Sequence, residues 1–287
     1  MSATGATLGD VLAGARTVLE AAGIPSHEAT VDVDLYARRI LGWDRARVLT
    51  GRGEIPPAAL EPMFSGWVAR RARREPSAYI IGEREFYGRD FEVSPAVLIP
   101  RPETEHIIEA ALPLLAAQPN ALVADLGTGS GNIAVTLACE APGCRVIATD
   151  VSAEALEVAA RNAARHGVAN QVTFRCTSYL DGVSETFDVI AANPPYVREV
   201  DREGLSPSVR KEPEVALFGG ADGMRGIEAV LDATVSHLRP GGWLLMEFGF
   251  GQEDLVREAV ARRASLRFDR VIADLQGLPR TAVVQRG

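Results

Sequence analysis

Cysteine is scarce in this sequence, which has only Cys139, Cys144 and Cys176 among its 287 residues. An odd number of cysteines without C-x-x-C spacing excludes a disulfide framework and a thiolate zinc site. Cys139 and Cys176 fall within apolar segments and Cys144 just precedes one, so we expect buried free thiols in a reducing compartment. The four histidines are scattered along the chain, and no metal site is expected.

Long apolar runs are also missing. No stretch approaches the about 20 residues that a membrane helix needs. Residues 1–10 lack the basic segment and the apolar core of a signal peptide. We therefore expect a cytoplasmic protein without a membrane partner.

Lysine is nearly absent, since Lys211 is the only one and arginine supplies the other cations. The formal net charge is −8. An acidic surface opposes sequence-independent binding to a phosphate backbone, so no direct nucleic-acid substrate is expected, although a local basic patch can override net charge. The basic cluster at 70–74 is either a solvated helix end, stabilised by the helix dipole, or a docking patch for an acidic partner or RNA.

Residues 1–75 predict a small helical domain with its own core. Helices are expected to begin near Thr7, Ser26 and Pro56, and Gly23 and Gly42 should end the first two. The side chains expected to face inward from the third helix are Leu60, Met63, Phe64, Trp67 and Val68. Aromatic residues alternate around Gly88, which predicts that residues 76–99 form a β-hairpin connector.

Residues 100–287 alternate continuous apolar runs with amphipathic segments. The expected strands are 121–126, 145–149, 172–176, 187–192 and 243–248, with a closing pair at 271–273 and 282–285. The expected helices are 103–117, 131–140, 153–166, 224–238 and 253–263. This alternation predicts an α/β fold with a mostly parallel sheet and helices on both faces.

An Asn-Pro-Pro-Tyr turn, Asn193 to Tyr196, follows the fourth expected strand. Pro194 and Pro195 have no backbone N–H, so the turn presents mainly hydrogen-bond acceptors. The side-chain oxygen of Asn193 and the carbonyl of Pro194 can accept both hydrogens of a planar NH2 group, and Tyr196 offers a flat ring beside it. The turn therefore suits a carboxamide or an exocyclic amine. On its own it is equally well a Pro-rich turn after a strand.

A glycine-rich segment begins with Asp125 and occupies a strand-to-helix turn, where open α/β sheets bind ligands. Its remaining candidate cofactor-binding residues are Gly127, Thr128, Gly129, Ser130 and Gly131. Glycines allow a ligand to approach the backbone closely. Their spacing is G-x-G-x-G, and Asn132 stands where the dinucleotide fingerprint requires glycine.

Further residues distinguish possible cofactors. Asp150 ends the next strand, where a carboxylate can bind ribose hydroxyls of either NAD or S-adenosylmethionine. Asp125 suits the ammonium of a methionine moiety, which together with the glycine spacing favours S-adenosyl-L-methionine. Tyr179 is either an adenine neighbour or an aromatic at the sheet edge.

These motifs, with Pro-Arg-Pro-Glu-Thr-Glu at 100–105, resemble the HemK/PrmC-type protein-glutamine N5-methyltransferases, which modify peptide chain release factors. The resemblance extends over 76–91, 98–105, 125–131, 193–196, 212–223, 240–242 and 274–280. It implies a seven-stranded Rossmann-like class I methyltransferase domain at 100–287 and a small N-terminal helical substrate-docking domain.

The resemblance also implies roles for individual residues. The loop 127–131, Asp150, Tyr179 and Asn193 would contact S-adenosylmethionine. The turn 193–196 would hold the glutamine of a Gly-Gly-Gln loop, with Asn193, Pro194 and Tyr196 at the reaction centre. Arg101 and Glu103, on a Pro-stiffened turn, would line the substrate cleft. Tyr179 departs from the family pattern, in which tryptophan is frequent at this position.

Three other functions fit parts of the pattern. An N6-adenine or N4-cytosine nucleic-acid methyltransferase would use the same acceptors, but it should carry a basic recognition region. A nicotinamide oxidoreductase is disfavoured by Asn132 and by the Asn-Pro-Pro-Tyr turn. A non-enzymatic cofactor-binding protein would have no need to keep Asn193 and the glycines together.

Overall fold

The computed structural model describes residues 5–287; residues 1–4, the start of the predicted helical domain, lie outside the described part. The described residues form two compact units. The first comprises the chain up to Gly82 together with Pro207–Lys211, and the second comprises Glu83–Ser206 and Glu212–Gly287. The structure thus divides the chain at Gly82, whereas the sequence suggested residue 75, and the predicted hairpin belongs to the second unit.

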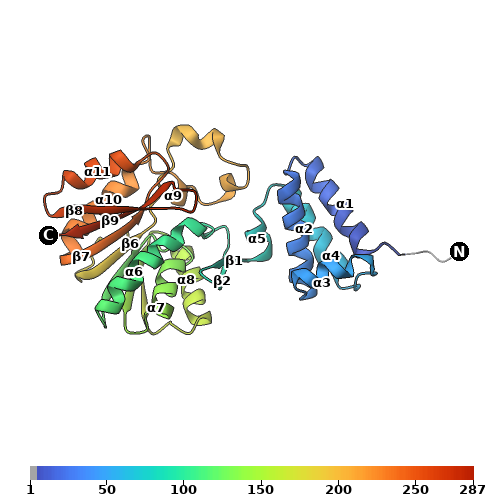
Figure 1. Ribbon diagram of the computed structural model, residues 1–287, viewed down its shortest axis with the longest axis horizontal. Helices are drawn as coiled ribbons and strands as arrows, with labels where there is room; N and C mark the ends of the chain where they lie inside the picture. Colours follow the sequence, from blue (N-terminus) through green and yellow to red (C-terminus); the bar gives the residue numbers. More distant parts are fainter. Residues whose placement is uncertain (1–4) are drawn as a thin grey trace. The chain divides into compact units, whose positions relative to one another are not determined.

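The first unit is helical (Figure 1). Its helices are α1 (Leu8–Ala21), α2 (Ser26–Leu41), α3 (Arg45–Thr50), α4 (Leu60–Ala72) and α5 (Ser77–Ile81), with a 3-10 turn η1 (Gly51–Gly53). Thr7 caps α1 as predicted, because its hydroxyl oxygen accepts from the N–H of Asp10 while its own N–H donates to the Asp10 carboxylate. The inward position predicted for Met63 is wrong, since this residue is 51% exposed.

The basic end of α4 makes structural contacts. Arg71 is only 5% exposed, and its Nε donates to Asp32 Oδ2 at 2.6 Å. Its Nη1 donates to the hydroxyl of Ser208 at 2.8 Å. The prediction of a solvated helix end is therefore wrong for Arg71, because the buried Asp32 carboxylate needs a paired cation. A docking role for the cluster 70–74 stays a prediction.

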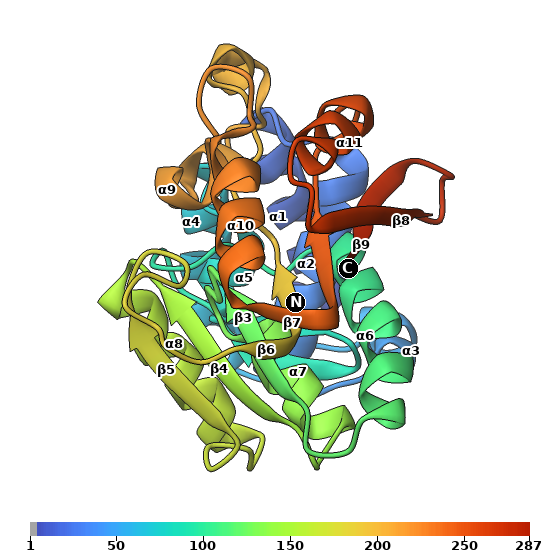
Figure 2. The same cartoon turned by 90° about the vertical axis from the view of Figure 1, so that its left-hand side faces the viewer.

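The second unit contains, within the described residues, one sheet of seven strands and a separate hairpin. The sheet strands are β3 (Leu122–Leu126), β4 (Arg145–Asp150), β5 (Val172–Cys176), β6 (Phe187–Ala192), β7 (Leu238–Glu247), β8 (Leu266–Ala273) and β9 (Pro279–Arg286). Their order is β5-β4-β3-β6-β7-β9-β8, and β9 alone runs antiparallel to both of its neighbours (Figure 2). The predicted hairpin is formed by β1 (Glu83–Phe86) and β2 (Arg89–Glu92). The predicted seven-stranded fold is confirmed.

Helices cover both faces of the sheet (Figure 1). One face carries α6 (Glu105–Ala117), α7 (Asn132–Glu140) and α8 (Ala153–Arg165), and the other carries α10 (Arg225–His237) and α11 (Glu253–Ala261). Successive strand residues alternate between the two cores, with Val123 in one and Ala124 in the other, as the pleat requires. The shorter elements are α9 (Glu214–Leu217) and the 3-10 turns η2 (Pro102–Thr104), η3 (Glu199–Gly204) and η4 (Val209–Lys211).

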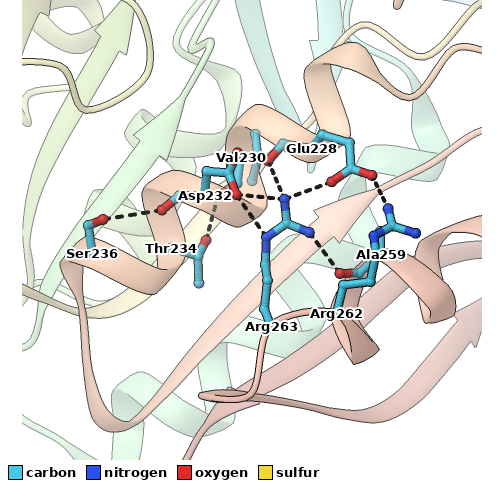
Figure 3. Close-up of polar contacts among 8 residues, drawn as sticks. All are labelled: Glu228, Val230, Asp232, Thr234, Ser236, Ala259, Arg262 and Arg263. Atoms are coloured by element: carbon cyan, nitrogen blue, oxygen red, sulfur yellow. Dashed lines mark hydrogen bonds and ion pairs between the residues drawn. The ribbon is translucent and has the colours of Figure 1, made fainter.

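Arg263 joins α10 to the end of α11 (Figure 3). Its guanidinium donates to Asp232 Oδ1 at 2.9 Å through Nε and to Glu228 Oε2 at 2.7 Å through Nη2. Nη1 donates to the carbonyl of Ala259 at 2.7 Å. The Arg263 side chain is 13% exposed, whereas that of Arg262, which also pairs with Glu228, is 58% exposed. One guanidinium therefore fixes two helices on the same face of the sheet.

The cysteines are all free, but only part of their predicted burial is found. Cys144 is buried and Cys139 is half-buried, while Cys176 is exposed. The prediction for Cys176 is wrong because β5 is the edge strand of the sheet, where side chains lose the cover of a second neighbouring strand. Among residues 5–287, no helix combines the length and the apolar composition that crossing a membrane requires.

Candidate active site

The glycine loop and the Asn-Pro-Pro-Tyr turn begin side by side. Strands β3 and β6 are parallel neighbours, and Leu126 pairs with Ala192 at their carboxyl ends. The chain crosses from β3 to β4 on one side, while β6 lies on the other, so this is the point at which strand order reverses. Open α/β sheets bind ligands at such a point. The first and fourth strands predicted for this region are therefore neighbours, and the two motifs lie together at one edge of the sheet.

The glycine loop needs its glycines. Gly127, Gly129 and Gly131 have φ values of 71°, 54° and 79°, in the left-handed region that L side chains rarely adopt. The N–H groups of Gly127 and Thr128 both donate to the carbonyl of Thr149 at 2.9 Å, which holds the loop against the end of β4. A Cβ on Gly131 would lie 3.0 Å from that of Ala159, so α8 packs directly on the loop.

Asp125 lies beneath the loop and is fully buried. Its Oδ2 accepts from the Thr128 hydroxyl at 2.6 Å and from the N–H of Ala134 at 3.1 Å. Its Oδ1 has no hydrogen-bond partner among the described residues. Burial raises the pKa of Asp125 to about 7, against the opposing effect of the two hydrogen bonds. A buried carboxylate oxygen without a partner is a site that a cation or a donor can satisfy.

Asp150 and Tyr179 line one cavity. Each oxygen of Asp150 accepts one backbone N–H, from Gly129 at 2.9 Å and from Ser152 at 3.0 Å. Tyr179 has a φ of 47° and is half-buried, and burial raises the pKa of its hydroxyl. The cavity measures about 200 Å³. Its walls include Gly127, Gly129, Asp150, Tyr179, Asn193 and Pro194.

The Asn-Pro-Pro-Tyr turn is anchored by a buried carboxylate. Asn193 Nδ2 donates to the hydroxyl oxygen of Thr104 at 3.0 Å, and that hydroxyl donates to Glu247 Oε2 at 2.6 Å. The Tyr196 hydroxyl donates to Glu247 Oε1 at 2.9 Å. Burial raises the pKa of both Glu247 and Tyr196, and for Tyr196 the nearby Glu247 carboxylate adds to the rise. Glu247 and Thr104 are each 1% exposed.

Glycines also crowd the back of this turn. A Cβ on Gly226 would lie 2.8 Å from the carbonyl oxygen of Pro195, and one on Gly223 would lie 2.3 Å from that of Tyr196. The Tyr196 carbonyl accepts from Gln252 Nε2 at 3.1 Å. Backbone therefore packs closely against the turn, and a side chain at position 223 or 226 would displace it.

In the Pro-stiffened turn 100–105, Arg101 forms an ion pair with a buried carboxylate as well as lining a cavity. Arg101 Nη2 donates to Glu212 Oε1 at 2.6 Å, and the other oxygen of this buried carboxylate accepts from the N–H of Ile99 at 3.0 Å. Arg101 lines a smaller second cavity together with Thr104 and Asn193. Glu103 lines neither cavity, so its predicted place in the cleft stays without support.

Sequence reasoning missed Thr104 and Glu247. Thr104 lies inside the Pro-Arg-Pro-Glu-Thr-Glu motif, beside the charged residues that were chosen instead. Glu247 was detectable as a carboxylate that directly follows the apolar run 243–246 at the end of β7. Within residues 5–287, no group of His, Cys, Asp and Glu side chains has the arrangement of a metal site.

Two family models match the chain. The PrmC N-terminal domain matches residues 10–82, and the methyltransferase small domain matches residues 109–206. The release factor glutamine methyltransferase of Koribacter versatilis is 44% identical over 92% of this chain and 93% of its own length. The release factor glutamine methyltransferase of Nitratidesulfovibrio vulgaris is 42% identical over 99% of this chain and 97% of its own.

Solved structures agree on the fold. A crystal structure of a methyltransferase from Pyrococcus furiosus superimposes with a TM-score of 0.52, at 21% identity, over 78% of this chain and 99% of that one. At this level of identity the likeness concerns architecture alone.

Proposed function

This chain belongs to the release factor glutamine methyltransferase family, and we propose that it methylates the side-chain amide nitrogen, N5, of the glutamine in the Gly-Gly-Gln motif of peptide chain release factors. The methyl donor is S-adenosyl-L-methionine. The relatives match nearly the whole chain. That span includes the regions matched by both family models, which supports the transfer of the relatives' activity to this chain. The observation that carries the proposal is the turn at Asn193, which is rich in hydrogen-bond acceptors and adjoins the glycine loop.

The residues around the larger cavity fit S-adenosylmethionine. Asp150 retains acceptor capacity for ribose hydroxyls after taking its two backbone N–H groups. Tyr179 offers a ring to the adenine, and the left-handed glycines let the backbone of 127–131 approach the ligand. The unpaired Oδ1 of Asp125 is our candidate acceptor for the methionine ammonium. The bound cofactor supplies an activated methyl group on a sulfonium.

The turn 193–196 positions the nucleophile. A carboxamide nitrogen is a poor nucleophile, because its lone pair is delocalised into the carbonyl. Asn193 Oδ1 and the Pro194 carbonyl accept hydrogen bonds from the two N–H groups of the substrate amide. These bonds orient the nitrogen and stabilise the positive charge that develops there. S-adenosylmethionine held here would supply the methyl carbon, whose bond to sulfur would break as its bond to the amide nitrogen formed.

No strong general base is needed. Once methylated, the amide nitrogen bears a positive charge and its N–H is acidic, so the proton passes to water. Asn193 and Pro194 cannot take it permanently, because neither is basic. The role of the chain is thus to hold the amide in place and to keep competing water away from the methyl group.

We further assign the helical first unit to docking of the release factor, and we place the enzyme in the cytoplasm, where that substrate occurs. The matching N-terminal family model supports a dedicated domain. The net charge of −8 supports a protein substrate over a nucleic acid.

Incubation with methyl-labelled S-adenosylmethionine and a purified release factor tests this function. Label should appear on the release factor and be lost when the glutamine of its Gly-Gly-Gln motif is replaced by alanine. Equal labelling of both proteins would contradict the assigned acceptor. Labelling of oligonucleotides in place of the protein would favour the nucleic-acid methyltransferase.

A further inference from the structure

Asn193 lines the cavity, and the orientation of its side-chain amide is set by a hydrogen bond to Thr104. We propose that Glu247, acting through Thr104, fixes which end of the Asn193 amide faces the substrate, and thereby selects a carboxamide over a carboxylate. The inference rests on the proposed function, since it concerns the same acceptor. Thr104 and Glu247 are positioning residues in this scheme and do not contact the reacting atoms.

Hydrogen-bond polarity runs in one direction along this relay. Glu247 accepts from two hydroxyls, one on each oxygen, so the single hydroxyl proton of Thr104 is directed at Glu247 Oε2, 2.6 Å away. The Thr104 oxygen is then left as an acceptor for its other neighbour. It takes a hydrogen from Asn193 Nδ2 at 3.0 Å. A flipped amide would set Asn193 Oδ1 against an oxygen that has no proton to give.

Burial makes this polarity strict. Thr104 and Glu247 are each 1% exposed, so water has no access to replace either bond. The second oxygen of Glu247 accepts from the Tyr196 hydroxyl at 2.9 Å, which satisfies the carboxylate from both sides. The relay is also held by the sheet, because Glu247 follows Met246, which pairs with Ala192 next to Asn193.

The consequence is discrimination between two side chains of nearly the same shape. With Nδ2 committed to Thr104, Asn193 offers its oxygen to the substrate. The NH2 group of glutamine can donate to that oxygen, whereas a carboxylate at the same place would meet acceptor with acceptor. Without the relay the Asn193 amide is free to rotate, and its NH2 end can then receive a carboxylate.

Thr104→Val and Thr104→Ser form a matched pair for the test. Valine keeps the shape and removes the hydroxyl, while serine keeps the hydroxyl. Turnover and binding are measured with a release factor that carries glutamine and with one in which glutamate replaces it. We expect Thr104→Val to lower kcat by about 10- to 100-fold and to reduce the Gln-over-Glu binding ratio by a similar factor. Thr104→Ser should restore both, and calorimetry should find cofactor affinity unchanged in either variant.

Glu247→Gln provides a second test that leaves Thr104 intact. A glutamine at 247 puts an NH2 donor in place of one of the two oxygens that accept the Thr104 and Tyr196 hydroxyls, so the binding ratio should also fall. Folded Thr104→Val and Glu247→Gln proteins with the wild-type Gln-over-Glu ratio would overturn the relay. Loss of cofactor affinity in parallel with kcat would instead mark a merely structural role and also overturn it.

Asn193→Ala separates this inference from the proposed function. Normal turnover in Asn193→Ala would remove the acceptor role itself, and the proposed mechanism with it. An inactive Asn193→Ala beside a Thr104→Val protein with an unchanged ratio would leave the mechanism standing and refute only the relay.

Discussion

Asn162 Nδ2 donates to the main-chain oxygen of Ser130 at 2.8 Å, which fastens helix α8 to the glycine loop. The same side chain accepts from the N–H of Glu92 at 2.7 Å and donates to its carbonyl at 3.0 Å. Asn162 is fully buried and its bond to Ser130 lies in the interior, so the Ser130 carbonyl has no water as a substitute, while Glu92 is half-buried. One amide therefore joins the β1–β2 hairpin, α8 and the cofactor loop.

Asn162→Ala should destabilise the protein by about 1–3 kcal/mol and weaken S-adenosylmethionine binding, because the buried carbonyl of Ser130 and the half-buried backbone groups of Glu92 lose their partner. Urea unfolding and calorimetric titration measure the two effects. Arg161→Ala is the control, since Arg161 pairs with Glu92 at the surface and should cost about 0–1 kcal/mol. Wild-type stability and affinity in Asn162→Ala would contradict the fastening role.

Gly131→Ala should be more destabilising than Gly129→Ala. Both glycines have positive φ, which costs alanine about 1–2 kcal/mol. At Gly131 the new Cβ also meets Ala159 at 3.0 Å, while at Gly129 nothing lies within 4 Å. The difference between the two variants in the free energy of unfolding therefore isolates the packing of α8 on the loop, at about 1–3 kcal/mol. Equal values would show that this contact relaxes without cost.

Asp125 predicts a pH dependence of stability. The pKa of Asp125 is about 7 in the folded protein against an ordinary value of 3.8, so between these values the native state binds more protons than the unfolded state. Stability should then fall as pH rises from about 4 to 7, because a buried carboxylate without a partner for Oδ1 must ionise. Asp125→Asn should flatten this slope in unfolding curves recorded across the range.

Ionisation of Asp125 should strengthen the binding of S-adenosylmethionine, whereas it weakens the stability of the free protein. If Asp125 Oδ1 accepts from the methionine ammonium, ionisation favours binding, and S-adenosylmethionine affinity should rise as pH increases through about 7. Asp125→Asn should abolish that rise. An affinity that stays level across this range in the wild type would argue against the contact.

Arg263→Ala should destabilise the second unit, whereas the neighbouring Arg262→Ala should not. The nearly buried Arg263 is the shared partner of Glu228, Asp232 and the Ala259 carbonyl (Figure 3). Its removal should cost about 2–3 kcal/mol, because charge-assisted bonds in a sheltered site are lost. Arg262 is mostly exposed and should cost less than about 1 kcal/mol. Thermal unfolding of both variants measures the difference.

The central strands β4 and β6 were predictable because each contains a continuous apolar run, whereas β8 was predicted only at 271–273 because Arg267, Asp269 and Arg270 interrupt its pattern. The predicted bounds of 172–176 and 187–192 match β5 and β6. Helices α3 and α5 were missed, since six and five residues are too few to display a helical period. Burial at Cys176 was mispredicted because a local pattern does not reveal which strand lies at the edge.

The motifs of the site could be found from the sequence, but the hydrogen bonds that hold the turn 193–196 in place could not. The glycine loop and the turn at 193–196 are contiguous, and each residue type has a local meaning. The relay from Glu247 to Thr104 joins residues 143 positions apart. It depends on the neighbouring positions of β6 and β7 and on the path of η2, so only the folded chain shows that the two polar groups meet.

The segment Pro207–Lys211 belongs to the helical unit although it comes far later in the chain. Ser208 supplies the hydroxyl that pairs with Arg71, 137 positions away. An N-terminal fragment that ends at Gly82 would therefore leave this buried guanidinium short of a partner. Transplanting the helical unit onto another methyltransferase would therefore require grafting residues 207–211 of this chain as well.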